Sequence, residues 1–419
     1  MFYFYDANLK IKHMGKNTYF FGNPVFGQLI NLIPTELITG LVDLNKSDYF
    51  YKRFKTYDHL VVMLYACIHR CESLRVLVSG MQAHHQKLRH LGLKDIPRRS
   101  TISDANGLRD ALFFEQLFHK LVSHYMGQLS DSRFKSNGKL TERLFMVDST
   151  TVKLFSDVMK GAGSKPSNGK CKGGAKVHVL LDSKHDLPRA VHITEGKDSD
   201  KVMLRLMGLP PHSILTFDKG YRDYKAWLEL SNNHITWVTR PIGDETYEVI
   251  QDSTIKQECS ERGILEDKLI KLGSGINKNV ILDARYVHYK DPVTHKELTF
   301  VTNNTILSAS QIAWIYKQRW QIEVFFKRLK RHTPLRYFLG ESENAIRIQI
   351  WCSLIVDFLM QWIKEKAKHS WSFANISAII RHLAMAYFNI FKYLDNPASE
   401  LIKREDARKQ LQLGLFTPT

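Results

Sequence analysis

The chain has 419 residues, of which 44% are hydrophobic and 11% aromatic, so it can build two or three globular domains and is not a mainly disordered protein. Its 60 Lys and Arg outnumber its 42 Asp and Glu, which gives a formal net charge of +18. This excess favours a polyanionic partner, with nucleic acid ahead of an anionic membrane surface.

No segment predicts a membrane span, because none reaches the roughly 18 apolar residues that a span needs. The closest, residues 350–363, contains Asp357 and is expected to be a buried helix. The N-terminal residues lack the layout of a signal peptide. The five Cys are scattered and suggest no disulfide framework. We therefore expect a cytoplasmic, reduced protein with no membrane partner.

Residues 25–135 have apolar side chains at three- and four-residue spacing, which predicts helices. Gly92 ends one predicted helix, Pro97 interrupts the chain, and Ser100 is placed to cap the next helix. The arginines near this second helix are Arg98, Arg99 and Arg109. The pattern fits a DNA-binding helix-turn-helix and an ordinary helical hairpin equally well. We predict that residues 1–135 form a helical N-terminal DNA-binding region.

From about residue 140, short apolar runs rich in β-branched residues predict strands. Over residues 136–242 the elements read β-β-β-α-β-α-β, which implies a mixed sheet with helices packed on it. Residues 243–308 carry short alternating strands and are predicted to be a β-rich insertion. Helices resume over residues 309–370, which complete the core, and a C-terminal helical region follows over residues 371–419.

One predicted helix, residues 315–332, has a single acid, Glu323, among six Lys and Arg. At about 100° per residue, four polar side chains share one narrow face opposite an apolar stripe. These four are Tyr316, Arg319, Glu323 and Lys330. A simple alternative is that Glu323 only pairs with Arg319 and Lys327, one turn away on either side. That pairing explains an ion pair but not why the helix keeps one acid.

Two aspartates follow buried strands: Asp148 follows the run LFMV, and Asp218 follows SILTF. A single Asp in such a place is usually a turn or helix-capping residue. In a mixed sheet, however, the two strands can be neighbours, and their ends then place the two carboxylates side by side.

Three carboxylates that converge in a low dielectric repel each other and need a counter-charge. A pair of Mg²⁺ ions, which prefer oxygen ligands, supplies that charge, and Mn²⁺ can replace them. Two such ions can activate a water and stabilise the leaving oxygen of a phosphodiester. We therefore predict that Asp148, Asp218 and Glu323 are metal ligands and catalytic residues, while the neighbouring cations hold the polyanion.

Other chemistries fit less well. Asp148-Ser-Thr is only distantly similar to an aspartic protease motif, and Asp218 is followed by Lys-Gly. The sequence contains no GxSxG or HExxH motif. His178 and His192 fall on adjacent predicted strands and are expected to be structural or DNA-facing rather than zinc ligands.

The residues Tyr316, Arg319, Glu323 and Lys330 match the pattern Tyr-x2-Arg-x3-Glu-x6-Lys, which resembles the signature of bacterial insertion-sequence transposases of the IS-four type. MVDSTTVKL and TFDKGYRDY resemble the two aspartate motifs of that family. The resemblance implies a ribonuclease H-like α/β core with a β-rich insertion and an all-helical N-terminal region. It also implies that Tyr316, Arg319 and Lys330, with Lys327, contact DNA near the cleaved end. Trp237 and Trp320 could stack on a displaced base, although a core role is at least as plausible.

The resemblance implies a DDE transposase that binds the terminal inverted repeats of its own mobile element, cleaves the ends and joins the 3′-OH groups to target DNA. It implies a homodimer on paired ends, a hairpin intermediate, and a nucleoid-associated bacterial protein. The alternatives are a metal-dependent nuclease or resolvase with the same core and a catalytically silent DNA-binding protein. The three acids argue against silence, and the N-terminal region argues against a simple nuclease.

Overall fold

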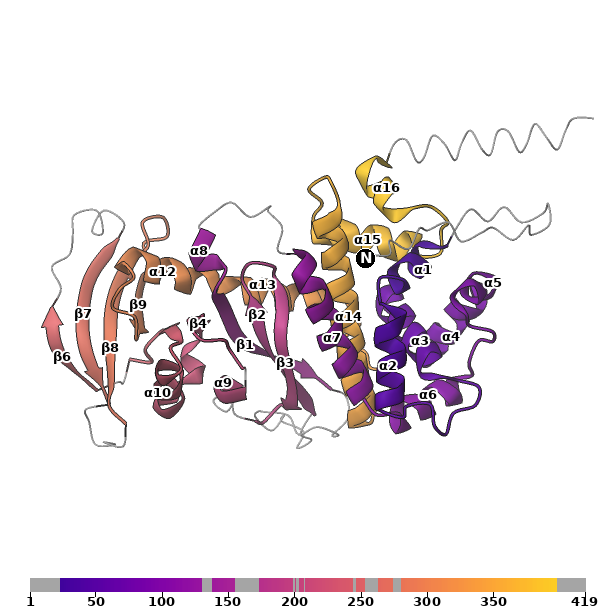
Figure 1. The fold of residues 1–419 in the computed structure, drawn as a ribbon, viewed down its shortest axis with the longest axis horizontal. Helices are drawn as coiled ribbons and strands as arrows, with labels where there is room; N and C mark the ends of the chain where they lie inside the picture. The colour runs from indigo at the N-terminus through magenta and orange to yellow at the C-terminus, as the bar shows by residue number, and fades with distance from the viewer. Residues whose placement is uncertain are drawn as a thin grey trace, which may run out of the picture. The chain divides into compact units, whose positions relative to one another are not determined.

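The computed structural model describes residues 23–129, 138–154, 173–198, 200, 203–206, 208–243, 246–252, 263–273 and 280–397 (Figure 1). The chain forms two compact units. The described part of the first comprises residues 23–35, 78–97 and 359–397, and the second runs over 36–77 and 98–358. The predicted boundary near residue 135 is thus not a boundary between these units.

The first unit joins the helix that starts the described chain to the last helices. Backbone amides of α1 (Val25–Ile30) donate to carbonyls near the end of α15 (Phe373–Leu383), as in the 2.7 Å bond from Phe26 to Ala384. The side chain of Gln28 bonds the backbone at both Phe388 and Ile390. The unit also holds α5 (His85–Leu88), η1 (Arg89–Leu91) and α16 (Ile390–Asp395).

The second unit combines helices from the N-terminal region with the sheet. Its N-terminal helices are α2 (Thr35–Leu44), α3 (Thr56–His69), α6 (Arg99–Leu108) and α7 (Leu112–Leu129), and α4 (Leu74–Ala83) begins in it. Asn344, on α14 (Glu343–Lys366), accepts from the amide of Ala111 and donates to the carbonyl of Arg109. The ring of Trp351 lies 5.7 Å from that of Phe118. Residues 98–129 therefore pack against the same helix that follows the sheet segment.

The sheet has nine strands in the order β3-β2-β1-β4-β5-β9-β8-β7-β6. The strands are β1 (Leu144–Lys153), β2 (Gly174–Asp182), β3 (Leu187–Glu195), β4 (Ile214–Phe217), β5 (Thr236–Thr239), β6 (Tyr247–Asp252), β7 (Ile264–Leu272), β8 (Leu282–Lys290) and β9 (Glu297–Thr302). Strands β1, β4 and β5 are parallel, and all other pairs are antiparallel. With α9 (Met203–Leu206) and α10 (Tyr224–Asn232), the order β-β-β-α-β-α-β is confirmed.

The segment predicted to be a β-rich insertion supplies β6 to β9. It does not form a separate sheet, because β9 pairs with β5, with Val238 opposite Thr302. Further helices are α8 (Gly138–Thr141), η3 (Lys219–Tyr221), α12 (Ala309–Gln318) and α13 (Trp320–His332).

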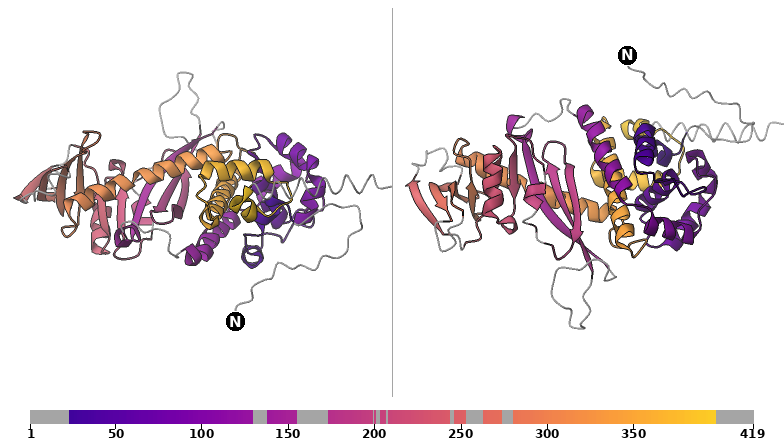
Figure 2. Two further views of the ribbon diagram at one scale, coloured as in Figure 1. Left: turned by 90° about the horizontal axis from the view of Figure 1, so that it is seen from above. Right: turned by 60° about the horizontal axis from the view of Figure 1, so that its bottom comes forward.

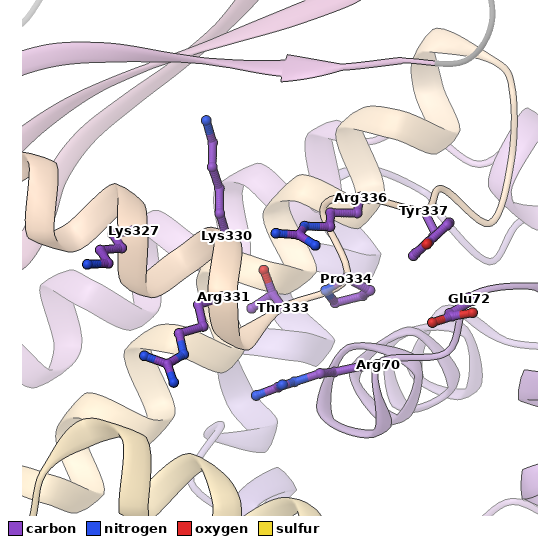
Figure 3. A pocket seen from close by; sticks show the side chains of 9 residues that line it. All are labelled: Arg70, Glu72, Lys327, Lys330, Arg331, Thr333, Pro334, Arg336 and Tyr337. Carbon is purple, nitrogen blue, oxygen red and sulfur yellow. The ribbon is translucent and has the colours of Figure 1, made fainter.

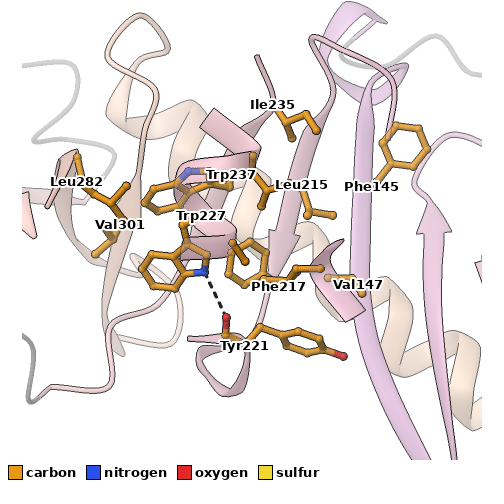
Figure 4. Packing of buried hydrophobic residues seen from close by; sticks show 14 of the residues in the cluster. Phe145, Val147, Leu215, Phe217, Tyr221, Trp227, Ile235, Trp237, Leu282 and Val301 are labelled. Carbon is orange, nitrogen blue, oxygen red and sulfur yellow. Dashed lines mark hydrogen bonds between the residues drawn. The ribbon is translucent and has the colours of Figure 1, made fainter. Parts of the chain in front are cut away.

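Alternating side chains of the central strands fill two cores, one on each face of the sheet. Val147, Phe217 and Trp237 contribute to one cluster, together with Trp227 on α10 (Figure 4). Leu144, Ile214 and Val238 contribute to the other, which α12 covers with Ile312, Ile315 and Tyr316.

Trp237 is a core residue, and the prediction that it stacks on a DNA base is wrong. Its side chain is 0% exposed, and its ring lies 4.9 Å from that of Trp227. Its indole N–H donates to the hydroxyl of Ser231 at 2.9 Å, which satisfies the one polar group of the ring. No face of Trp237 is left for a base.

The helix predicted over residues 315–332 is divided at Arg319 into α12 and α13, which run end to end along the sheet (Figure 2). Around Arg319 the amides bond three residues back, from Arg319 to Tyr316 and from Ile322 to Arg319, which tightens the turn without ending the helical path. Ser308 and Gln311 form a capping box that fixes the start of α12.

Among the described helices, only α14 is long and apolar enough to cross a membrane. Its most apolar 18-residue stretch is 89% buried inside the protein. The prediction of a buried helix over residues 350–363 is confirmed.

Candidate active site

The sheet places Asp148 beside Asp218. Strands β1 and β4 pair in parallel, and the last pair in register is Val147 with Phe217, so the next residue of each strand is an aspartate. β4 ends there, whereas β1 continues to Lys153. Asp218 occupies the position before η3, but its carboxylate makes no capping hydrogen bond. The side chain is therefore available to the site rather than committed to capping.

Glu323 reaches the same place through Arg319. The guanidinium of Arg319 donates to Glu323 at 2.7 Å and lies 3.6 Å from a carboxylate oxygen of Asp148. The predicted pair between Arg319 and Glu323 is thus present. The same guanidinium also lies against Asp148, so it connects Glu323 to Asp148. The hydroxyl of Tyr316 points at Asp218, with 3.5 Å between the oxygens.

The electrostatics of Asp148 reflect this convergence. Burial raises the pKa of its carboxyl to about 6. The amide of Ser149 and the charge of Arg319 oppose that rise, while the negative charges of Asp218 and Glu323 add to it. Asp148 therefore lies close enough to both other acids to be repelled by them, and Arg319 is the counter-charge of Asp148 and Glu323.

The donor set is one that a hard divalent cation prefers, because all three groups are carboxylates. Among the described residues, no three His, Cys, Asp or Glu side chains are arranged closely enough to hold a metal ion as they stand. The guanidinium of Arg319 supplies the positive charge in this arrangement. Asp148, Asp218 and Glu323 are the residues that would hold the ion.

A polar network beside Asp148 was missed by the sequence analysis. Ser149 donates to Asp200 at 2.8 Å, and Lys176 lies 3.3 Å from the same carboxylate oxygen. The imidazole of His178 is fully buried, bonds the hydroxyl of Thr194 at 3.0 Å, and has its pKa lowered to about 4, mainly by burial. Lys176 and His178 are two residues apart on β2, so their side chains lie on the same face of the sheet. This spacing is the feature of the sequence that could have predicted the network.

Tyr221 is a second group that sequence reasoning missed. Its ring is 2% exposed, and its hydroxyl meets no partner at normal hydrogen-bond geometry among the described residues, although the hydroxyl of Ser149 is near enough to lower its pKa. Burial raises its pKa, and the charges of Asp200, Asp148 and Asp218 raise it further. A buried donor therefore lies among the carboxylates of the site.

The cations of α13 have different environments. Lys330 donates to the carbonyl of Thr151, three residues after Asp148, at 3.0 Å. Lys327 is exposed, and Trp320 is 64% exposed, so both are accessible to a ligand. Arg328 instead is buried and pairs with Asp357 at 3.1 Å and with Asp186. The cations of this helix are therefore not all available to a polyanionic ligand, because Arg328 is part of the core.

Helices end before Gly92 and begin after Pro97 as predicted, while a DNA-binding helix-turn-helix stays a prediction. Gly92 follows η1 with a positive φ of 86°, but the next helix begins at Arg99 and its cap position is Arg98, not Ser100. Arg98 and Arg99 are exposed.

Arg109 is not a DNA-facing residue, and its prediction is wrong. It is 2% exposed, donates to the carbonyls of Phe54 and Lys55, and lies over the ring of Tyr51 at 4.3 Å. Its guanidinium holds the loop before α3.

Comparison with known proteins identifies the class. Residues 139–358, about half of the chain, match the family described as Transposase DDE domain, and residues 21–94 match a Domain of unknown function (DUF4372). The chain belongs to the DDE transposases, and is an enzyme of that family. The predicted resemblance to insertion-sequence transposases of the IS-four type is confirmed.

The relatives include a protein of Sinorhizobium fredii that is named as a transposase (y4zB), 31% identical over 63% of this chain and 71% of its own length. A protein of Synechocystis sp., named as the transposase for insertion sequence element IS4SA, is 27% identical over 62% of this chain and 70% of its own. A solved piggyBac transposase synaptic complex with hairpin DNA aligns at a TM-score of 0.39 and 12% identity, over 91% of this chain and 83% of that one.

Proposed function

We propose that this transposase binds the terminal inverted repeats of an insertion sequence, hydrolyses the phosphodiester at each end, and joins the freed 3′-OH to target DNA. The observation that carries the proposal is the meeting of Asp148 and Asp218 beside each other on neighbouring parallel strands, with Glu323 linked to Asp148 through Arg319. The parallel β1-β4-β5 centre with antiparallel β2 and β3 supports a ribonuclease H-like core.

The family implies a divalent metal, and we propose Mg²⁺, with Mn²⁺ as a substitute, held by the three acids. When bound, two such ions activate the attacking water and neutralise the leaving oxygen. Asp148 supplies a carboxylate that is ionised above pH 6. Arg319 and Lys330 hold and orient the scissile phosphate, and exposed Trp320 and Lys327 extend that contact. Tyr316 has only 7% of its surface exposed, which leaves little of it for DNA, so its main role is to orient Asp218.

Residues 1–135 are proposed to recognise the inverted repeats, with exposed Arg98 and Arg99 as phosphate contacts. We propose a homodimer on paired ends, because two ends must be joined together, and a cytoplasmic protein associated with the nucleoid. The competing functions are a nuclease or resolvase, which would cut without joining, and a silent DNA-binding protein, which would do neither.

The test uses the full chain with Mg²⁺ and a labelled DNA end of the element. Asp148→Asn, Asp218→Asn and Glu323→Gln should each lower cleavage and strand transfer by on the order of 10³-fold, since each removes several kcal/mol of charge stabilisation. DNA binding should persist. The losses should not add in double variants, because the acids act as one unit.

Asp252→Asn is a matched control, because that carboxylate is 71% exposed on β6. It should retain wild-type cleavage. Near wild-type cleavage by any one acid variant removes that residue from the site. Cleavage without any joined product would assign the chain to the nucleases instead.

A further inference from the structure

A basic cavity of about 660 Å³ opens beyond the C-terminal end of α13 (Figure 3). We call it the arginine pocket; its lining includes Arg70, Lys327, Lys330, Arg331, Arg336 and Tyr337. Its acidic lining residue is Glu72. The excess of cations gives the pocket a strongly positive potential.

The positive charge of the arginine pocket is not balanced locally. Among the described residues, no carboxylate lies within ion-pair distance of Lys327, Arg331 or Arg336, whereas buried Arg285 and Arg328 each pair with an aspartate. The pKa of Lys330 is lowered by burial and by the charge of Lys153. Glu72 is one acid among several cations, so the like charges of the pocket still cost free energy, and an anionic ligand removes that cost.

A second cavity, of about 420 Å³, continues the arginine pocket along β1. It shares Lys330, Arg336 and Tyr337 with the first, and the end of β1 supplies residues 151–153, followed by Leu154. Thr151 is three residues from Asp148, which is about 10 Å along a strand. The two cavities thus form a path that begins close to the acids and leads away from them.

We propose that these two cavities form one groove that binds the sugar-phosphate backbone of the DNA strand leading away from the cut. The inference rests on the proposed function and adds residues to it: Arg331 and Arg336 contact phosphates, and Tyr337, 42% exposed, packs on a sugar or base. At about 3.4 Å per nucleotide of duplex, 10 Å places the start of the groove, at Thr151, about three nucleotides from the cut.

The test measures binding of an uncleaved DNA end by the full chain, without divalent metal, as salt is varied. The double variant Arg331→Gln/Arg336→Gln should bind at least tenfold more weakly. It should also lower the slope of log affinity against log salt by about 1.8, because each lost phosphate contact removes about 0.9. The control double variant Lys290→Gln/Lys296→Gln removes two exposed charges at the ends of β8 and β9 and should keep both values.

Two further arms locate the contact. Tyr337→Leu should weaken binding without changing the slope, since no charge is lost. Uncharged methylphosphonate linkages about three nucleotides from the cut should abolish the difference between wild type and the arginine variant. If wild type fails to bind the DNA end, the proposed function itself fails. If wild type binds and the arginine double variant matches the lysine control, the groove inference is overturned. It is also overturned if the arginine double variant loses affinity for a labelled nucleoside triphosphate but not for DNA.

Discussion

Arg319 explains why α13 keeps one acid among its cations. Its guanidinium contacts both Glu323 and Asp148. In the free protein its positive charge therefore reduces the repulsion between these two carboxylates. The meeting of Asp148 and Asp218 was predictable from sequence, because each follows a buried apolar run and the two runs pair in parallel, although β1 continues beyond Asp148. Asp200 was not predictable, because its contact with Ser149 depends on how the chain returns after β3.

Tyr221→Phe tests whether the buried hydroxyl beside the acids has a function. It makes no hydrogen bond of normal geometry to the described residues and interacts only weakly with the hydroxyl of Ser149, so its removal should change the free energy of unfolding by less than about 1 kcal/mol. Cleavage should fall about tenfold, equal to about 1.4 kcal/mol, if the hydroxyl orients a carboxylate once DNA is bound. Urea denaturation and single-turnover cleavage measure the two effects. Unchanged cleavage would make Tyr221 only a packing residue.

Trp237 and Arg109 show where residue-type reasoning fails. Both types are common in DNA contacts, yet each is buried here, and the indole N–H of Trp237 and the two terminal nitrogens of Arg109 bond inside the protein. Periodicity on a four-residue strand or at a helix end is too short to tell an inward from an outward side chain. Burial of such residues is decided by contacts between distant segments.

At the scale of the element, α13 combines a structural cation with functional ones. Its helical pattern predicted the face that carries Arg319, Glu323 and Lys330, and the structure brings those residues to the end of β1. The pattern could not predict that Arg328 pairs with Asp357, because that partner lies 29 residues away on another helix.

Arg328→Met should destabilise the protein by about 3–5 kcal/mol, because it leaves the buried carboxylate of Asp357 without its partner. The double variant Arg328→Met/Asp357→Leu should recover most of that loss, since no buried charge remains. Lys327→Met, next in sequence but exposed, is the control and should change stability by less than about 0.5 kcal/mol. Urea denaturation measures all three. Equal stability of Arg328→Met and Lys327→Met would contradict a structural role for Arg328.

At the scale of the molecule, the succession of strands and helices over residues 136–242 could be read from the sequence because each of these strands is a local apolar run. The division into units could not. Helices from residues 36–77 and 98–129 belong with the sheet, as in the contact between Cys67 and Ser353 at 3.6 Å. Contacts between segments almost 300 residues apart leave no local signal, so a boundary at residue 135 was the natural expectation from composition.

The second unit should lose stability in mild acid because it buries a neutral histidine. His59 is 0% exposed, bonds the side chain of Asn106 at 2.8 Å, and has its pKa lowered to about 3, first by burial and then by the charge of Arg109. In the unfolded chain this histidine binds a proton near pH 6.5, whereas in the folded chain it stays neutral. The free energy of unfolding therefore has its full value above pH 6.5 and falls by up to about 1.4 kcal/mol for each pH unit below it. His59→Gln should reduce this slope between pH 4.5 and 6.5 in urea denaturation, while His124→Gln, at an exposed position on α7, should keep it. Identical slopes in wild type and His59→Gln would show that other groups cause the acid sensitivity.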